Sequence, residues 1–457
     1  MISRTFRIPL LIFGVLALLL ATAAPVAAHG TGADPDDGKA KSGLTLEDIE
    51  AMPTSDLEAM GSAECANGMA AIFPCQNVDL AAFVPLEELG GVNGSDIWGW
   101  EDPLTGREYA IMTTGEGTAF VDVTQPSAPV VVGILPTNEV DRRLLWRDVK
   151  VYADHAFVVS ENRPHGMQVF DLTRLRNVLI PPAVFTADTV YEGFGNAHNV
   201  AVNPDTGYAY AVGTNTCNGG LHMVNIQDPT NPTFAGCAGE DGYVHDVECV
   251  IYQGRDGRFR GDEICFGSNE DTVTIYDVTD KANPVVLSKT SYPTSGYTHQ
   301  GWLTPDHRWF LFGDELDEFF GNVGNTTTYI MQVTKLDQPA QVVPFTHSTR
   351  TIDHNLYIHG SHVYEANYVE GLQILSYDRK SLGEGRLSRE AFFDVVPGVD
   401  EAVFGGAWSS YKFDSGTTVV SAIESGLFVL LPDLSGGEAS ADGQLIASGS
   451  TQGPMAG

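Results

Sequence analysis

The hydrophobic pattern of this chain is a series of short runs in which apolar and polar residues alternate between a turn residue and a Pro-containing turn. The clearest runs are residues 117–124 (GTAFVDVT), 166–173 (GMQVFDLT), 220–227 (GLHMVNIQ), 272–279 (TVTIYDVT), 371–378 (GLQILSYD) and 426–432 (GLFVLLP). Alternation with a period of two is typical of β-strands, because successive side chains point to opposite faces of a sheet. We assign these runs to the third strand of a repeated all-β unit.

A second regularity precedes each of these strands by a similar distance: a polar residue stands at the start of another apolar run. The polar residue is Asp96, Asp148, His198, His245, His299 and His354 in turn, and the seventh unit has Ala407 there. The steps between these positions are 52, 50, 47, 54, 55 and 53 residues. Strand repeats of this length predict an all-β fold, a seven-bladed β-propeller. Six blades with an irregular insertion is the alternative, because the unit near residues 327–333 is poorly patterned.

The ends of the repeat array predict how the ring closes and where the domain begins. Residues 78–89 resemble an outer strand without a blade of their own, whereas the last unit, residues 406–433, supplies only three clear strands. We expect the N-terminal strand to complete the last blade and to remove exposed sheet edges. The propeller then spans residues 78–433, between an extension with a spacer and short helical turns (29–77) and a flexible tail (434–457).

The first 28 residues predict a secreted protein. Arg4 and Arg7 precede an apolar run at residues 8–24, and small residues follow, which is the pattern of a signal peptide. A membrane anchor is the alternative, but this run is shorter than the roughly 20 residues that a span requires. We therefore expect an extracellular location, with a periplasmic or cell-surface location as the alternative, and no membrane span after cleavage.

Cysteine content and charge narrow the class further. In an oxidising compartment, six cysteines predict three disulfides between near neighbours, with free buried thiols as the alternative. The expected pairs are Cys65 with Cys75, Cys217 with Cys237, and Cys249 with Cys265. The net charge of −34 argues against nucleic acid as a partner, because phosphate binding needs a basic surface. The excess acid forms either a solvated surface or sites for divalent cations.

Several motifs resemble those of secreted LVIVD-repeat proteins, a family also labelled choice-of-anchor B. They are residues 96–110 (DIWGWEDPLTGREYA), 120–129 (FVDVTQPSAP), 160–173 (SENRPHGMQVFDLT) and 275–284 (IYDVTDKANP). The resemblance covers most of residues 65–432 and implies an extracellular β-propeller without a settled activity, often attached through C-terminal signals. Residues 435–457 depart from it, because they lack a hydrophobic tail or sorting motif, so we expect a free protein. The resemblance supplies no catalytic residues.

A third ring of polar residues follows the second strand of each repeat, and topology predicts that it shares one face with the histidines. Its members are Glu116, Glu161, Asn215, Asn269 with Glu270, Glu315, Asn367 and Glu424. In an up-and-down blade the first strand starts on the face where the second strand ends. Both rings therefore surround one end of the propeller axis.

The converging imidazoles predict a divalent metal site. Neutral His suits zinc, copper or iron, and added carboxylates suit mixed sites or calcium. We expect the ligands among His198, His245, His299, His354, Asp96 and Asp148. Supporting or ligand-contacting roles are expected for Asp246, Glu161, Glu315, His165 and Trp408. An empty cluster of this kind should titrate near neutral pH, because the carboxylates offset imidazolium repulsion. The alternative is a polar channel in which each His bonds water or backbone.

Two function classes remain at this point. As a binding protein, the chain would present the central site to a metal, a small polar ligand, an extracellular protein or a glycan, and we expect it to act as a monomer. As an enzyme, it would be a metal-dependent extracellular hydrolase or lyase that uses the same site. Signatures of a serine nucleophile, a zinc protease helix or a phosphate loop are absent from the sequence.

Overall fold

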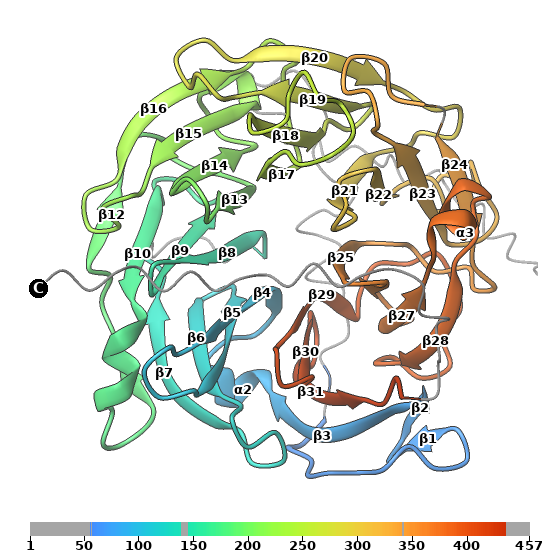
Figure 1. Cartoon of the computed structure of the whole chain (residues 1–457). Coiled ribbons are helices and arrows are strands. Elements are labelled where there is room, and N and C mark those ends of the chain that lie inside the picture. The colour runs from blue at the N-terminus through green and yellow to red at the C-terminus, as the bar shows by residue number, and fades with distance from the viewer. Residues whose placement is uncertain (1–54, 56, 139–144, 341, 436–457) are drawn as a thin grey trace, which may run out of the picture.

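The first strands of the repeats form an inner ring, and the later strands of each repeat extend outward from it (Figure 1). The computed structural model describes residues 55, 57–138, 145–340 and 342–435. Seven separate sheets surround the axis, so the prediction of a seven-bladed β-propeller is confirmed and the six-bladed alternative is wrong. The expected signal peptide, most of the spacer with its helical turns, and most of the tail lie outside the described residues.

Blades 1 to 4 follow in chain order. Blade 1 contains β4 (Gly94–Glu101), β5 (Glu108–Thr114), β6 (Gly117–Asp122) and β7 (Val130–Pro136), and β11 (Ala183–Val184) adds to its edge. Blade 2 contains β8 (Arg147–Tyr152), β9 (His155–Ser160), β10 (Met167–Asp171) and β12 (Thr189–Tyr191). Blade 3 contains β13 (Asn199–Asn203), β14 (Tyr208–Val212), β15 (Leu221–Asn225) and β16 (Thr233–Ala238). Blade 4 contains β17 (Asp246–Ile251), β18 (Glu263–Ser268), β19 (Val273–Asp277) and β20 (Val285–Thr290).

Blades 5 to 7 complete the ring. Blade 5 contains β21 (Thr298–Leu303), β22 (Trp309–Asp314), β23 (Thr327–Gln332) and β24 (Val343–Thr346). Blade 6 contains β25 (Asn355–His359), β26 (His362–Ala366), β27 (Leu372–Ser376) and β28 (Ser388–Phe393), and β2 (Phe73–Gln76) and β1 (Met69–Ala70) extend its edge. Blade 7 contains β29 (Ala407–Lys412), β30 (Thr418–Ala422), β31 (Gly426–Pro432) and β3 (Val78–Pro85). Short helices are α2 (Leu86–Leu89), η1 (Leu172–Asn177), η2 (Cys217–Gly219) and α3 (Arg379–Gly383).

The hydrophobic pattern of each strand follows its place in the blade. The second strands β5 and β22 are buried along their whole length, because neighbouring sheets cover both of their faces. The outer strand β20 has no fully buried residue. Between each pair of neighbouring blades the alternating apolar side chains form one core, for example where Phe120 stacks on Phe170 at 4.6 Å. These seven cores hold the inner strands at a constant distance from the axis.

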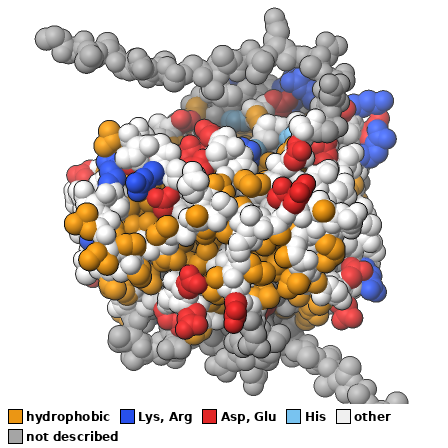
Figure 2. Space-filling model, turned by 90° about the horizontal axis from the view of Figure 1, so that it is seen from below, with side chains coloured by type: hydrophobic (Ala, Val, Ile, Leu, Met, Phe, Trp, Pro, Cys, Tyr) orange, Lys and Arg blue, Asp and Glu red, His pale blue; other side chains and the backbone are white. Residues whose placement is uncertain are grey.

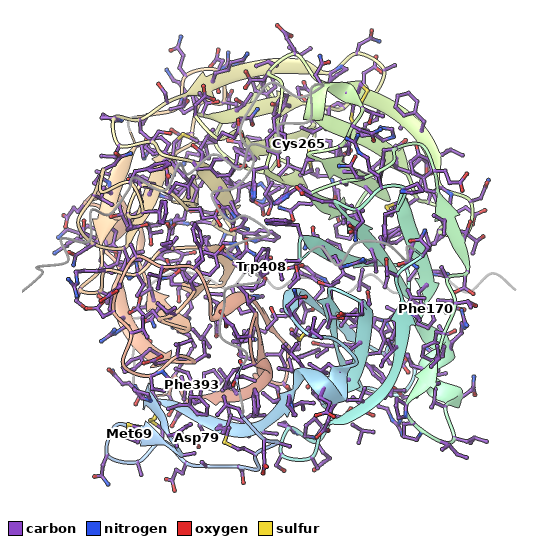
Figure 3. All side chains as sticks on the ribbon, turned by 180° about the vertical axis from the view of Figure 1, so that it is seen from behind. Met69, Asp79, Phe170, Cys265, Phe393 and Trp408 are labelled. Atoms are coloured by element: carbon purple, nitrogen blue, oxygen red, sulfur yellow. A yellow bond between two sulfur atoms is a disulfide. The ribbon has the colours of Figure 1, made fainter. Side chains whose placement is uncertain are left out.

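The chain closes the ring as predicted. β3, at the start of the propeller, pairs antiparallel with β31 at its end, with Val84 opposite Leu427 (Figure 1). Blade 7 therefore combines three C-terminal strands with one N-terminal strand. In Figure 3 the labelled Trp408 lies beside the axis, and Met69 and Asp79 lie at the outer rim. Closure of this kind leaves no gap in the ring through which the blades could separate.

The described residues contain the three disulfides that the cysteine spacing predicts. Cys65 bonds Cys75, Cys217 bonds Cys237, and Cys249 bonds Cys265 across the facing strands β17 and β18. No free cysteine is present among these residues. The alternative of free thiols is therefore wrong. No helix of the described part is both long and apolar enough to cross a membrane.

The side of the disc seen in Figure 2 carries its negative charge in a scattered form. On the rim that Figure 2 shows, acidic side chains stand singly or in small groups among hydrophobic ones. The net charge of −34 is therefore not gathered into one patch on this rim. The buried ionisable groups near the axis are a better guide to function than this surface.

Candidate metal centre

The four predicted histidines lie at the inner edge of four consecutive blades. His198, His245 and His354 immediately precede β13, β17 and β25, and His299 is the second residue of β21. Contacts between neighbouring first strands define their register. The Nδ1 atom of His245 donates to the carbonyl oxygen of His299 at 2.8 Å, and that of His354 donates to the carbonyl oxygen of Trp408 at 2.5 Å. Trp408 therefore holds the matching position in blade 7.

The same contact identifies the matching residues of the first two blades. The hydroxyl of Ser95 donates to the carbonyl oxygen of Arg147 at 2.9 Å, so Ser95 and Arg147 occupy the histidine position. The sequence spacing places Asp96 and Asp148 there, one residue further along each strand. A β-bulge near the start of β4 explains the difference in blade 1, because a bulge inserts a residue that spacing cannot reveal.

The imidazoles of His198, His245, His299 and His354 form one continuous row. Successive ring centres are 4.2, 4.1 and 4.3 Å apart. All four side chains are at most 4% exposed, although each comes from a different sheet. The row ends against Trp408, whose ring centre is 4.8 Å from that of His354. Four residues spread over more than 150 positions of sequence thus converge on one small volume.

Hydrogen bonds fix the tautomers of three of these rings. The Nδ1 atoms of His245 and His354 donate to the backbone carbonyls described above, and Nδ1 of His198 lies 2.7 Å from Oε1 of Glu161. A proton on Nδ1 leaves the lone pair on Nε2, which is how metal-binding histidines are commonly oriented. Among the described residues, Nε2 of His245 and Nδ1 of His299 are buried without a hydrogen-bond partner. The row therefore presents unused nitrogen lone pairs.

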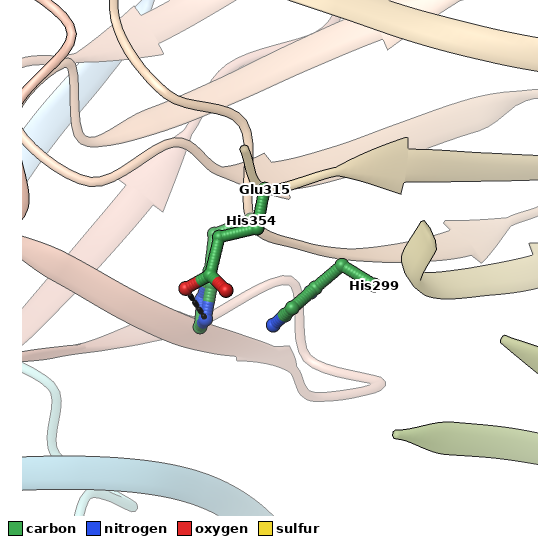
Figure 4. A group of neighbouring side chains, drawn as sticks. All are labelled: His299, Glu315 and His354. Atoms are coloured by element: carbon green, nitrogen blue, oxygen red, sulfur yellow. Dashed lines mark ion pairs between the residues drawn. The ribbon is translucent and has the colours of Figure 1, made fainter. Parts of the chain in front are cut away.

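Glu315 supplies a carboxylate at the end of this row (Figure 4). It follows β22, and its Oε1 lies 3.9 Å from Nε2 of His354. One nitrogen from each of His299 and His354 and one oxygen of Glu315 lie within 4.8 Å of one another. The hydroxyl of Tyr368 donates to Oε1 of Glu315 at 2.5 Å, while Oε2 is buried without a partner among the described residues.

Burial sets the protonation of the cluster. It lowers the pKa of His354 to about 3, and together with neighbouring imidazoles it holds the pKa of His245 and of His299 well below the ordinary value. The imidazoles of His245, His299 and His354 are therefore neutral at physiological pH, which differs from the expectation that the cluster titrates near neutrality. Burial has more effect than the carboxylates because no solvent reaches these rings. Burial raises the pKa of Glu315 to about 7, and the hydrogen bond from Tyr368 opposes that rise.

These groups enclose a narrow cavity. Its walls are Trp146, His198, Asn199, His245, His299, Glu315, His354, Asn355 and Trp408. The space open to the centre of a water molecule is about 10 Å³, which corresponds to about one water. The cavity therefore fits a single ion or water rather than an organic molecule.

Asp96 and Asp148, which the sequence proposes as ligands, do not line this cavity. Both bind the ammonium group of Lys150, at 3.0 Å and 2.5 Å, and that group lies 4.7 Å from the centre of the Trp98 ring. Although burial alone would lower the pKa of Lys150, the two carboxylates raise it well above its ordinary value. The second oxygen of Asp148 accepts the backbone N–H of Val200 at 2.7 Å. This side of the axis is thus a paired ionic network.

The remaining predicted residues divide between these two regions. Glu161 touches His198, and Trp408 lines the cavity. Asp246 belongs with the ionic network: burial and the nearby Asp148 raise its pKa to about 7. His165 lies outside the cavity wall, where its Nε2 approaches the guanidinium of Arg147 at 3.4 Å. The contacts of Glu161 and Glu315 with histidines of the next blade agree with the prediction that both rings share one face.

Comparisons with known proteins add little to what the structure shows. No family model matches this chain, and neither does any curated protein. Similar solved structures include a protein from Lactobacillus plantarum (15% identity, 72% of this chain and 91% of that chain, TM-score 0.48). Others are the β-propeller domain of Cps50 (Swd1) from Myceliophteria thermophila (10%, 75% and 97%, 0.46) and periplasmic gluconolactonase PpgL from Pseudomonas aeruginosa (13%, 64% and 81%, 0.40). At these identities and scores, function has to be argued from the site.

Proposed function

We propose that this protein is a β-propeller that binds one divalent transition-metal ion in its central cavity. His299, His354 and Glu315 are the ligands, and Nε2 of His245, whose ring lies 4.1 Å from that of His299, is a further donor. The observation that supports this assignment is the set of buried, neutral imidazoles around one cavity, in which His245 and His354 keep Nε2 free of a proton because their Nδ1 atoms donate to backbone carbonyls. Zinc, copper and iron suit two imidazoles and one carboxylate, whereas calcium prefers oxygen alone.

The electrostatics of the cavity favour this use over that of a water-filled channel. A polar channel would leave its histidines free to bond water, but the cavity has room for only about one molecule. Metal binding requires imidazoles without a proton on the ligating nitrogen, and burial already keeps them neutral. The cation would also remove the cost of an ionised Glu315 in a buried position.

Location and family belong to the same proposal. We propose that the chain is an exported member of the LVIVD-repeat, choice-of-anchor B group, on the strength of the motifs quoted above. Three disulfides are consistent with an oxidising, extracellular compartment. In such a compartment the protein would hold its metal, or present it to a small polar ligand, at one face of the disc.

A second candidate, a metal-dependent hydrolase, rests on the pair formed by His198 and Glu161. An imidazole held by a carboxylate at 2.7 Å is an arrangement that accepts protons from water in many enzymes. Its ring lies 4.2 Å from that of His245 and so beside the metal site. Turnover of a small ester or lactone that is lost in His198→Gln, while metal content stays unchanged, would favour the enzyme over the binding protein.

The test of the main proposal is metal analysis of untagged protein. We expect about one zinc, copper or iron ion per chain, and Co²⁺ added to metal-free protein should give visible absorption bands typical of nitrogen ligands. His354→Ala should weaken binding by more than about 100-fold, because a ligand matters more than its supporting contacts. His222→Ala is the matched control, since His222 is 2% exposed but binds Tyr191 away from the cavity. Full metal content in the double variant His299→Ala, His354→Ala would overturn the proposal.

A further inference from the structure

A second cluster of buried carboxylates lies beside the central cavity, between blades 5 and 6. Asp317 and Glu318 follow β22 in the connection to β23, and Asp353 stands just before β25. One oxygen from each residue lies within 4.8 Å of the others. Their side chains are buried, with residue exposures of 0%, 6% and 3%. The three residues come from two blades, so the cluster joins blade 5 to blade 6.

Each carboxylate accepts a hydroxyl or backbone N–H through one oxygen. Tyr329 donates to Oδ2 of Asp317 at 2.5 Å, the N–H of Thr327 donates to Oε1 of Glu318 at 2.7 Å, and the N–H of Asp314 donates to Oδ2 of Asp353 at 3.0 Å. Oδ1 of Asp317, Oε2 of Glu318 and Oδ1 of Asp353 are buried and receive no N–H or O–H from the rest of the described residues, and the carboxyls of Asp317 and Glu318 lie close enough to share a proton. Three such oxygens in one place are unusual, because buried polar atoms are nearly always satisfied.

Within the part of the chain that the structure describes, no positive side chain pairs with these carboxyls. None of the ion pairs found among the described residues includes Asp317, Glu318 or Asp353. Burial, followed by repulsion from Asp353 and Asp317, raises the pKa of Glu318 far above its ordinary value. A bound cation would remove that cost.

We propose that Asp317, Glu318 and Asp353 bind Ca²⁺. The donor set consists of oxygen alone, which selects a hard cation over the metals that suit the histidine row. At Ca–O distances of about 2.3–2.6 Å, two ligands of one ion stand at most about 5 Å apart, and the three oxygens, all within 4.8 Å of one another, satisfy that limit. Mg²⁺ holds its oxygen ligands closer, at about 2.0–2.1 Å, in a stricter octahedral geometry.

The position of this site gives Ca²⁺ a structural role next to the central cavity. Asp353 adjoins His354, and Asp317 is two residues from Glu315. Gly313 makes room for the cluster, because a Cβ at that position would stand 2.0 Å from Oδ2 of Asp353. A cation here would fasten the β22–β23 connection to the start of β25. The inference does not depend on the proposed transition-metal site, because the two clusters share no residue.

Ca²⁺ titration of the full-length protein, after removal of metals with chelator, tests this proposal. Ca²⁺ should bind with one ion per chain by calorimetry and should raise the thermal unfolding midpoint by about 2 °C or more at saturation. Tb³⁺, a luminescent substitute for Ca²⁺, should bind and be displaced by Ca²⁺. Mg²⁺ at the same concentration should give a smaller shift, and an equal or larger Mg²⁺ shift would overturn the assignment to Ca²⁺.

Two variants and a matched control locate the ion. Glu318→Gln and Asp353→Asn should each weaken Ca²⁺ binding by about tenfold or more, because ligand charge sets calcium affinity. Both should unfold at or above the wild-type midpoint without Ca²⁺, since they relieve repulsion. The control is Glu248→Gln: Glu248 is also buried and also accepts one backbone N–H, from Leu303 at 2.7 Å, but it stands apart from the cluster. It should keep the wild-type Ca²⁺ response.

The failure of this proposal is separable from failure of the central site. Ca²⁺ binding that persists in His299→Ala, His354→Ala, with transition-metal binding that persists in Glu318→Gln, would establish two independent sites. Absence of any Ca²⁺ effect on the wild-type protein would overturn the proposal whatever the central cavity binds. An equal Ca²⁺ response in wild type, Glu318→Gln and Asp353→Asn would do so as well.

Discussion

The two sides of the propeller axis use buried polar groups in opposite ways. In blades 1 and 2, Asp96 and Asp148 both bind Lys150, so each charge has a partner within 3.0 Å. In blades 4 to 6, burial keeps the imidazoles of His245, His299 and His354 neutral, and two ring nitrogens of the row are buried without a hydrogen-bond partner among the described residues. On the side of blades 1 and 2 the ionic groups pair with one another. On the histidine side, atoms that could bind a metal have no partner among the described residues.

This difference shows how to separate a structural network from a binding site in one ring of repeats. The carboxylates of Asp96 and Asp148 are as deeply buried as the imidazoles of the row, so burial does not distinguish the two sides. What distinguishes them is whether the hydrogen-bond and charge requirements are met from within the chain. By that criterion Lys150 with its two carboxylates stabilises the inner ring, and the histidine row with Glu315 is available to a ligand.

The largest effect should follow from removing the cation of the ionic network in blades 1 and 2. Lys150→Met leaves Asp96 and Asp148 buried without their cation, which typically destabilises a protein by about 3–5 kcal/mol. Urea denaturation with the disulfides intact should therefore show a much lower midpoint. The variant should still bind metal where it remains folded, because Lys150 does not line the cavity.

Lys281→Met is the control for that variant. Lys281 forms an ion pair at 2.7 Å with Glu263 alone, away from the axis, and its side chain is 10% exposed. Its loss should cost clearly less than the loss of Lys150. Equal costs for the two substitutions would mean that the axial network has no special role, and the contrast between the two sides of the axis would lose its basis.

The repeat architecture could be predicted from sequence because each blade repeats the same physical requirement. Alternating runs such as residues 272–279 have to bury one face on each neighbour, and they do so as β19 and its equivalents. The closing strand was predictable for a related reason: residues 78–85 are apolar, and the last blade lacked a fourth strand. Cysteine spacing indicated all three disulfides because each pair joins segments close in sequence.

The candidate sites were harder to predict, because they depend on where individual side-chain atoms lie and not on the intervals between residues along the chain. Bulges in β4, β21 and β29 shift the first strands, so equal intervals pointed to Asp96 in place of Ser95. Arg147 was missed because a guanidinium does not resemble a ligand. The sequence indicated only a supporting or ligand-contacting role for Glu315. The hydrogen bond from Tyr368 and the 3.9 Å distance to His354 show that its carboxylate is part of the cluster itself.

The carboxylates of the proposed calcium site left almost no signal in the sequence. Asp317 and Glu318 lie in the stretch DELDEF, which reads as an acidic loop on the surface. Asp353 stands out in the sequence only because it precedes His354. Only the packing of blade 5 on blade 6 brings their oxygens within 4.8 Å, and pairing across blades cannot be deduced from a single chain without coordinates.

A smaller effect should come from a contact that holds Glu315 in place. Tyr368→Phe removes the hydroxyl that donates to Glu315 at 2.5 Å, so the carboxylate loses its orientation and its proton competes better with the metal. Supporting contacts of this kind change metal affinity by about 10–100-fold. Competition with a chromophoric chelator measures that change.

Tyr357→Phe is the matched control from the ionic side of the axis. Its hydroxyl is buried near Lys150, and its closest hydrogen-bond contact is Ser409 Oγ at 3.4 Å. We expect metal affinity to stay within about twofold of wild type, because this ring does not line the cavity. If both tyrosine variants lost the same affinity, the metal site could not be assigned to the histidine side alone.

A pH-dependent effect concerns Glu248, a buried carboxyl for which the described residues offer no ion-pair partner. Burial raises its pKa from the ordinary 4.5 to about 8, so the folded protein keeps a proton there that the unfolded chain releases above pH 4.5. The stability from this group is present below pH 4.5 and is lost as the pH rises towards 8. The slope is at most about 1.4 kcal/mol per pH unit.

Glu248→Gln, which cannot ionise, should remove that slope, so the free energies of unfolding of variant and wild type should diverge in favour of the variant between pH 5 and pH 8. Parallel curves over this range would mean that Glu248 reaches water or an unseen cation, and that the axis neutralises all its carboxylates as it does Asp96 and Asp148.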